Sequence, residues 1–150
     1  MINPSPSRRL LSFLAPLALL LTAANLHAES PISISLSGAA EVPPVTTAAK
    51  GTVHITITPD RMVSGNIKVS GIVPTMAHIH EGTVGKNGPP IITLNKTLDD
   101  SFAVPADAKL SEAQYSSFLA GNLYINAHSA AYPNGEIRAQ LPGKPMRIAN

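Results

Sequence analysis

The sequence contains no cysteine, and this absence excludes several kinds of chemistry. The chain forms no disulfide and offers no thiolate nucleophile, so its stability must come from packing. Any metal site must use histidine, methionine, carboxylate or backbone ligands. The chain also lacks a G-x-S-x-G motif, and the glycines of residues 81–88 do not have the spacing of a phosphate loop. We interpret that segment as a long turn between strands.

Aromatic and charged residues are scarce. Only 4% of the chain is aromatic and 13% is charged, there is no tryptophan, and 44% is hydrophobic. This hydrophobic content excludes an intrinsically disordered chain and indicates a core of valine, isoleucine, leucine and alanine. Fourteen prolines and ten glycines are too many for a protein of long helices and favour short strands joined by tight turns.

Residues 1–28 have the features of a secretory signal peptide. Arg8 and Arg9 precede an apolar stretch over residues 10–24 and a small-residue cleavage site that ends at Ala28. The stretch is shorter than the roughly 20 residues that span a bilayer, which favours a cleaved leader over an anchor. Without the leader, nine Lys and Arg balance nine Asp and Glu. These scattered basic residues argue against nucleic-acid binding, and we expect a periplasmic or secreted protein without membrane contact after cleavage.

Short segments of alternating hydrophobic and polar residues follow the leader. In residues 52–58, for example, Val53, Ile55 and Ile57 share one face. Short strands at this spacing predict an all-β fold, an antiparallel Greek-key β-sandwich, rather than an α/β fold. The predicted strands cover residues 31–36, 52–58, 62–70, 76–80, 90–94, 122–128 and 135–141.

One short helix is predicted between Ser111 and Gly121. Ser111 and Gln114 have the spacing of a capping box, and Gly121 suits a left-handed helix end. Ala113, Phe118 and Leu119, with Tyr115 alongside, are expected to dock the helix on the sandwich. The domain is expected to span residues 29–142, with a C-terminal tail over residues 143–150.

Three histidines are the main candidates for chemistry. His78 and His80 are one residue apart in a predicted strand, so both imidazoles lie on one face, about 7 Å apart along the strand. Two such rings can converge on one metal ion if the strand curves. His128 ends another strand and would supply a third ring. Met76 lies on the same face as His78 and is a candidate soft fourth ligand, which would favour Cu(I).

Other interpretations of these side chains remain open. Adjacent histidines on a strand are more often a solvated face than a metal site, and His128 could instead hydrogen-bond a carbonyl in the turn over residues 132–135. His54 lies on the polar face of its strand and is interpreted as solvent-exposed. Glu136 and Arg138 are expected to pair across or along the sheet. We predict no catalytic residue.

Four sequence blocks together resemble the CHRD (chordin) domain family. They are LSGAAEVPP at residues 36–44, AHIHEG at 77–82, GNLYINAH at 121–128 and PNGEIRAQL at 133–141. The blocks follow the family's order and the resemblance covers about residues 32–142, although Ala139 replaces a usual glycine and Ala127 a commoner valine. The resemblance implies a secreted all-β domain of the bacterial single-domain type, whose biochemical role is poorly defined.

The His-Ile-His block is also similar to the His-Val-His block of Cu/Zn superoxide dismutases, which lies on a Greek-key sandwich and supplies copper ligands. This similarity implies His78 and His80 as copper ligands, with His128 as a later ligand. The chain lacks the cysteine pair of the dismutases and the added histidines and aspartate of their zinc loop. A dinuclear site is therefore not implied.

Three functions are compatible with these observations. The leading hypothesis is an exported protein that binds copper, with zinc as the alternative ion, through His78, His80, His128 and Met76, for metal buffering or resistance in the periplasm. A second hypothesis is a metal-free adhesion or protein-interaction module whose histidines order its loops. A third is a copper-dependent redox enzyme of the dismutase type. We expect a binding protein rather than an enzyme, and the sequence identifies no protein partner.

Overall fold

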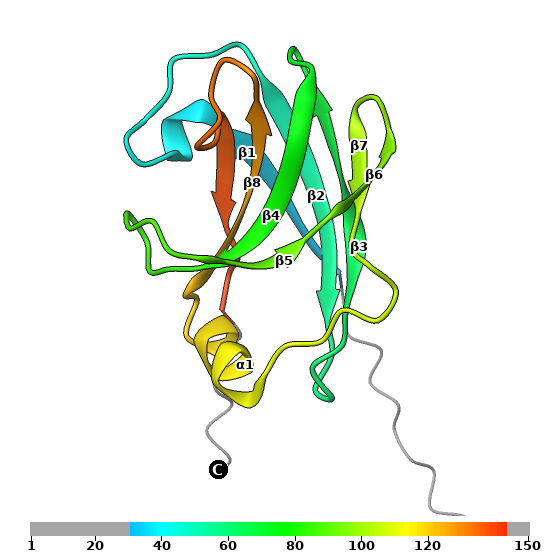
Figure 1. The fold of residues 1–150 in the computed structure, drawn as a ribbon. Coiled ribbons are helices and arrows are strands. Elements are labelled where there is room, and N and C mark those ends of the chain that lie inside the picture. The colour runs from blue at the N-terminus through cyan, green and yellow to red at the C-terminus, as the bar shows by residue number, and fades with distance from the viewer. Residues whose placement is uncertain (1–30, 144–150) are drawn as a thin grey trace, which may run out of the picture.

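The computed structural model describes residues 31–143, which form nine strands, an α-helix and one turn of 3₁₀ helix (Figure 1). The 3₁₀ turn, η1 (Gly38–Ala40), follows the first strand, and the helix α1 (Glu112–Leu119) lies between the seventh and eighth strands. The strands are β1 (Ile32–Ser37), β2 (Lys50–Ile57), β3 (Val63–Ser70), β4 (Pro74–Glu81), β5 (Pro90–Thr93), β6 (Asn95–Leu98), β7 (Ser101–Ala103), β8 (Leu123–Ser129) and β9 (Ile137–Gln140).

All nine strands belong to one antiparallel sheet, in the order β5-β4-β8-β9-β1-β2-β3-β7-β6. After β3 the chain crosses to the other half of this order, so β4 pairs with β8 and β5 instead of β3. The sheet curls round its core until it is nearly closed (Figure 1). The predicted all-β antiparallel class is confirmed, and the strands of the sandwich form one continuous hydrogen-bonded sheet.

The alternation of side chains on β4 determines where the histidines lie. Ala77 and Ile79 are fully buried in the aliphatic core. Because successive residues of a strand point to opposite faces, His78 and His80 must lie on the outer face of the sheet. The core thus fixes the direction of both imidazoles.

The next strand, β8, is buried on both faces. Its seven residues are all buried, although only alternate ones, such as Leu123 and Ile125, belong to the hydrophobic core. Three connections, here called the covering loops, bury the outer face: residues 38–49, 82–89 and 130–136. The side chain of Asn87 donates a 2.6 Å hydrogen bond to the carbonyl of Val42, which joins the first two of these loops. The outer surface of β4 and β8 is therefore a partly enclosed site.

The helix begins and ends where the sequence predicts. The Ser111 hydroxyl accepts from the backbone N–H of Gln114, and the Gln114 side chain accepts from the backbone N–H of Ser111, completing the capping box. Gly121 has a φ of 77°, a conformation that favours glycine. Phe118 is fully buried and attaches the helix to the core. Ala113 is exposed, so its predicted docking role was wrong.

The seven predicted strands are all present, with ends that differ by a few residues. Two further strands, β6 and β7, were not predicted. The predicted leader over residues 1–28 and nearly all of the predicted tail lie outside the described residues. Within residues 31–143, no helix has the length and apolar character needed to cross a membrane.

Candidate metal centre

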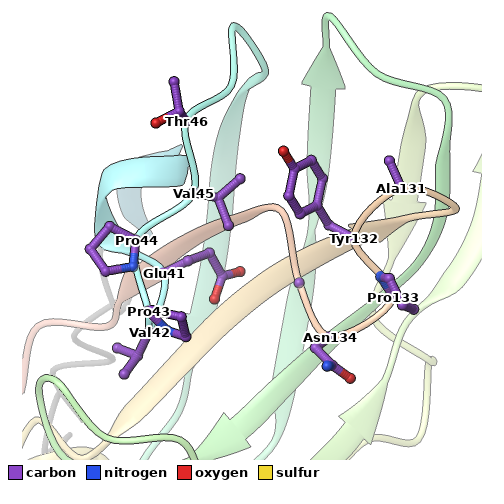
Figure 2. A pocket seen from close by; sticks show the side chains of 11 residues that line it. Glu41, Val42, Pro43, Pro44, Val45, Thr46, Ala131, Tyr132, Pro133 and Asn134 are labelled. Carbon is purple, nitrogen blue, oxygen red and sulfur yellow. The ribbon is translucent and has the colours of Figure 1, made fainter.

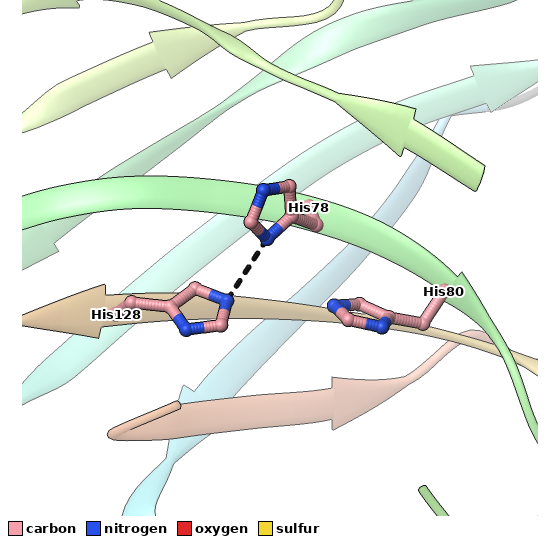
Figure 3. A group of neighbouring side chains, drawn as sticks. All are labelled: His78, His80 and His128. Carbon is pink, nitrogen blue, oxygen red and sulfur yellow. Dashed lines mark hydrogen bonds between the residues drawn. The ribbon is translucent and has the colours of Figure 1, made fainter. Parts of the chain in front are cut away.

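His78, His80 and His128 come together on the outer face of the sheet (Figure 3). The first two lie on β4, and His128 lies on the adjacent strand β8. In the register of these strands, His78 is opposite Asn126 and His80 is opposite Tyr124. The pairing of β4 and β8 therefore collects three imidazoles and one amide on a single patch of surface.

The ring nitrogens are close enough for the side chains to share an ion after a small adjustment. Nδ1 of His78 lies 3.0 Å from Nε2 of His128. One ligand atom from each of the three residues lies within 4.8 Å of the others. Tetrahedral ligands at 2.0–2.1 Å from an ion are about 3.3 Å apart, so the widest contact must shorten by roughly 1.5 Å. Binding an ion therefore requires the rings to move closer by side-chain rotation.

Backbone carbonyls determine which nitrogen of His80 and of His128 carries a proton. Nδ1 of His80 lies 2.9 Å from the carbonyl oxygen of Gly88, and Nδ1 of His128 lies 2.9 Å from that of Pro133. A carbonyl oxygen only accepts, so both Nδ1 atoms carry hydrogen and donate it. In the neutral rings, the lone pairs are consequently on Nε2. Histidines that bind metals are commonly oriented in this way.

Both Nε2 atoms face the side chain of Asn126. Its Oδ1 lies 3.0 Å from Nε2 of His80 and 3.0 Å from Nε2 of His128. Two Nε2 lone pairs and an amide oxygen repel one another, so this contact needs a proton or cation between them, or an amide turned so that Nδ2 donates to the rings. Asn126 shares its face of β8 with His128, but sequence reasoning did not select it as a site residue.

All three imidazoles favour the neutral form. Burial, followed by the charges of His128 and His80, lowers the pKa of His78 from 6.5 to about 4. Burial also lowers the pKa of His80 and that of His128, although the Gly88 and Pro133 carbonyls act in the opposite direction. At neutral pH the cluster therefore presents uncharged nitrogen donors, which is the protonation state that metal coordination requires.

An aromatic stack supports His80 from behind. The Tyr124 ring lies 4.6 Å from that of His80 at an interplanar angle of 9°, and the Arg138 guanidinium carbon lies 3.4 Å from the Tyr124 ring centroid. Arg138 is buried and donates to Asn87 Oδ1, the Lys86 carbonyl and Gln140 Oε1. The stack fixes the plane of the His80 ring.

The predicted pairing of Glu136 with Arg138 was wrong. The carboxylate of Glu136 instead accepts hydrogen bonds from the hydroxyls of Thr47 and Ser129. Both side chains are buried. Their partners, Thr47 for Glu136 and residues 86–87 for Arg138, come from distant parts of the chain, so the local sequence gave no sign of this.

A cavity of about 500 Å³ lies between residues 41–46 and 131–135 (Figure 2). Glu41, which is only 5% exposed, is part of its wall. Its Oε1 accepts a 3.5 Å hydrogen bond from Asn126 Nδ2, and burial raises the pKa of Glu41. Gly135 packs so closely here that a Cβ would lie 2.5 Å from Oε1 of Glu41. The cavity wall is thus connected to the histidines through Asn126.

The remaining predicted side chains differ in their relation to the cluster. Met76 lies opposite His128 in the strand register, but its side chain is 44% exposed, and its role as a ligand stays a prediction. His54 is exposed on β2, as predicted. The predicted contact of His128 with a loop carbonyl is also present, at Pro133, and it coexists with the clustering of the three rings.

These features define an all-β domain with a histidine cluster on its outer face. A comparison with protein families matches residues 32–141 to the CHRD domain, and the chain belongs to that family. CHRD domains occur in extracellular proteins. No curated protein and no solved structure matches the chain, so the similarity to a dismutase copper site gains no support.

The four sequence blocks of the family meet around the histidines. Residues 36–44 contribute Glu41, residues 77–82 contribute His78 and His80, and residues 121–128 contribute Asn126 and His128. The last block, residues 133–141, supplies the carbonyl that accepts from His128 and the arginine beneath Tyr124. The segments by which the chain resembles its family therefore surround one site.

Proposed function

We propose that this exported domain binds one transition metal ion, with copper as the favoured ion and zinc as the alternative, for metal buffering or resistance outside the cytoplasm. The ligands are Nε2 of His80, Nε2 of His128 and one ring nitrogen of His78. Met76 lies two residues before His78 on β4 and is the candidate soft fourth ligand.

The observation that carries this proposal is the direction of the Nε2 lone pairs. Two backbone carbonyls accept hydrogen bonds from the Nδ1–H groups of His80 and His128, which leaves both Nε2 atoms as electron-pair donors toward the same region. The third ring makes its 3.0 Å contact at one of these atoms. Coordination through Nδ1 of the neutral His78 ring requires its proton to shift to Nε2 of the same ring, while the other two tautomers need no change.

The donor set favours copper over harder cations. The three grouped ligand residues are histidines, and no carboxylate is among them. Imidazole suits copper and zinc, whereas magnesium and calcium prefer oxygen ligands. Among divalent first-row ions, Cu²⁺ binds most tightly to a given nitrogen site.

The proposal is tested by titrating the purified protein with Cu(I), Cu(II) and Zn(II) in competition with a chromophoric chelator. We expect one ion per chain, and binding about 100-fold or more weaker in the double variant His78→Ala/His80→Ala. His54→Ala is the matched control, because His54 is exposed on a different strand, and it should bind as the wild type does.

Two outcomes would contradict the proposal. Equal binding by the double variant and the wild type would place the ion elsewhere. Absence of binding by the wild type, together with lower stability of His128→Ala, would favour a metal-free interaction module in which His128 holds the loop at Pro133. The third candidate, a copper-dependent redox enzyme, requires the copper-loaded protein to dismutate superoxide faster than free copper does.

A further inference from the structure

A buried positive charge lies behind one of the proposed ligands. The Arg138 side chain is 2% exposed, and its guanidinium covers one face of the Tyr124 ring. The other face of Tyr124 stacks on His80. The column Arg138–Tyr124–His80 thus leads from a fixed cation to the ring whose Nε2 faces the proposed ion.

No carboxylate touches this cation among the described residues. The hydrogen-bond acceptors of Arg138 are neutral: Asn87 Oδ1 at 3.0 Å, the Lys86 carbonyl at 2.9 Å and Gln140 Oε1 at 3.2 Å. Tyr124 and Glu41 are the acidic groups whose charge would act on it, and burial raises the pKa of the Glu41 carboxyl. Because arginine stays protonated in proteins, its charge persists at the site.

We propose that Arg138 biases the site toward Cu(I) over Cu(II). This inference rests on the proposed function. An ion bound to three neutral imidazoles receives no compensating charge from them, so the nearby guanidinium opposes a dication more strongly than a monocation. The covering loops and the Tyr124 ring keep water from the space between the two charges, which limits screening.

The expected size follows from the length of the column. The two stacking spacings put the cation roughly 8–10 Å from the proposed ion, where one additional unit charge at an effective dielectric constant of about 20 changes relative affinity by roughly 10–30-fold. Tyr124 supplies the rigid separation and Arg138 supplies the charge. Arg138 therefore acts on the ion by its charge, without contacting it.

Three variants separate charge from structure. Arg138→Gln removes the charge, and Arg138→Lys keeps it while losing the planar fork. Asn87→Asp leaves Arg138 in place and puts a carboxylate beside it. It also removes the hydrogen bond that the Asn87 amide donates to Val42, so Asn87→Ala, which loses that bond without adding a charge, is its control. If Arg138→Gln does not fold, Asn87→Asp still tests the effect of neutralising the charge.

The measurement is the Cu(II)/Cu(I) midpoint potential of the copper-loaded protein, with both affinities measured by chelator competition. We expect Arg138→Gln and Asn87→Asp to strengthen Cu(II) relative to Cu(I) at least about tenfold, which lowers the potential by about 59 mV. Arg138→Lys should stay near the wild type. Parallel weakening of both oxidation states with an unchanged potential would show a merely structural role and overturn the inference alone. Failure of the wild type to bind copper would overturn the proposed function and the inference with it.

Discussion

Replacing Gly135 by alanine tests how the loop after β8 is held against the histidine cluster. Gly135 has a φ of 126°, which side-chain-bearing residues rarely adopt. A Cβ at this position would lie 2.5 Å from Oε1 of Glu41 and 2.6 Å from Nδ2 of Asn126. The substitution therefore strains the backbone and forces apart the two side chains that connect the cavity to the histidines.

The magnitude follows from these two effects. A residue held in such a backbone conformation costs about 1–3 kcal/mol, and disrupting the buried contacts of Glu41 and Asn126 costs about 1–3 kcal/mol more. We expect Gly135→Ala to lower the free energy of unfolding by about 3 kcal/mol. Gly85→Ala is the matched control: its φ is 73°, but no atom lies within 4 Å of the added Cβ, so the cost should be about 1 kcal/mol.

Urea denaturation of both variants and the wild type measures the difference. Chelator competition measures copper affinity in parallel, and only Gly135→Ala should bind copper more weakly because it displaces the loop whose Pro133 carbonyl orients His128. Equal destabilisation by the two glycine variants, or unchanged copper affinity of Gly135→Ala, would refute the close packing that connects this loop to the cluster.

Three further predictions concern the histidines, the helix and the leader. In the metal-free protein the unfolded state binds more protons than the folded state between about pH 6.5 and the lowered histidine pKa values, so the free energy of unfolding should fall as the pH drops below 7. Allowing for solvent screening, His78 should account for about 1 kcal/mol of the loss in the free energy of unfolding between pH 7 and 5. A His78→Ala variant whose free energy of unfolding, measured by urea denaturation, falls just as steeply with pH would contradict this. Phe118→Ala should cost about 3–5 kcal/mol because this ring is fully buried, whereas Leu98→Ala, at a residue that is 67% exposed, should change stability by less than about 0.5 kcal/mol; comparable losses in thermal or urea unfolding would argue against α1 being docked by Phe118. Finally, we predict that the protein is exported and that its mature form begins at Glu29, and an intact mass that includes residues 1–28 would show that the leader is retained.

Periodicity predicted β2, whose burial alternates, and missed the edge strand β6, whose residues are all exposed. Val53, Ile55 and Ile57 on β2 are buried and their neighbours are largely exposed, which is the pattern that the sequence shows. The residues of β6 (Asn95–Leu98) are all exposed, so this edge strand carries no hydrophobic alternation to detect. Its existence depends on backbone pairing with β7, which residue types do not reveal.

The site was predictable only in part, for a similar reason. The one-residue spacing of His78 and His80 placed both rings on one face, and the strand character of residues 122–128 suggested the third ring. The roles of Asn126, Arg138 and Glu41 depend on the register of β4 with β8 and on loops far away in sequence. Arg138 is buried by a loop that is distant in sequence, and in the sequence it occupies a position of β9 that looks polar and exposed. It could therefore not be distinguished from a surface residue.

The most direct test of the central claim is the anomalous diffraction of the copper-loaded protein at the copper absorption edge. We predict a single strong peak about 2.0 Å from ring nitrogens of His78, His80 and His128. A peak elsewhere, for example beside the exposed His54, or no peak at the cluster in the presence of excess copper, would contradict the account.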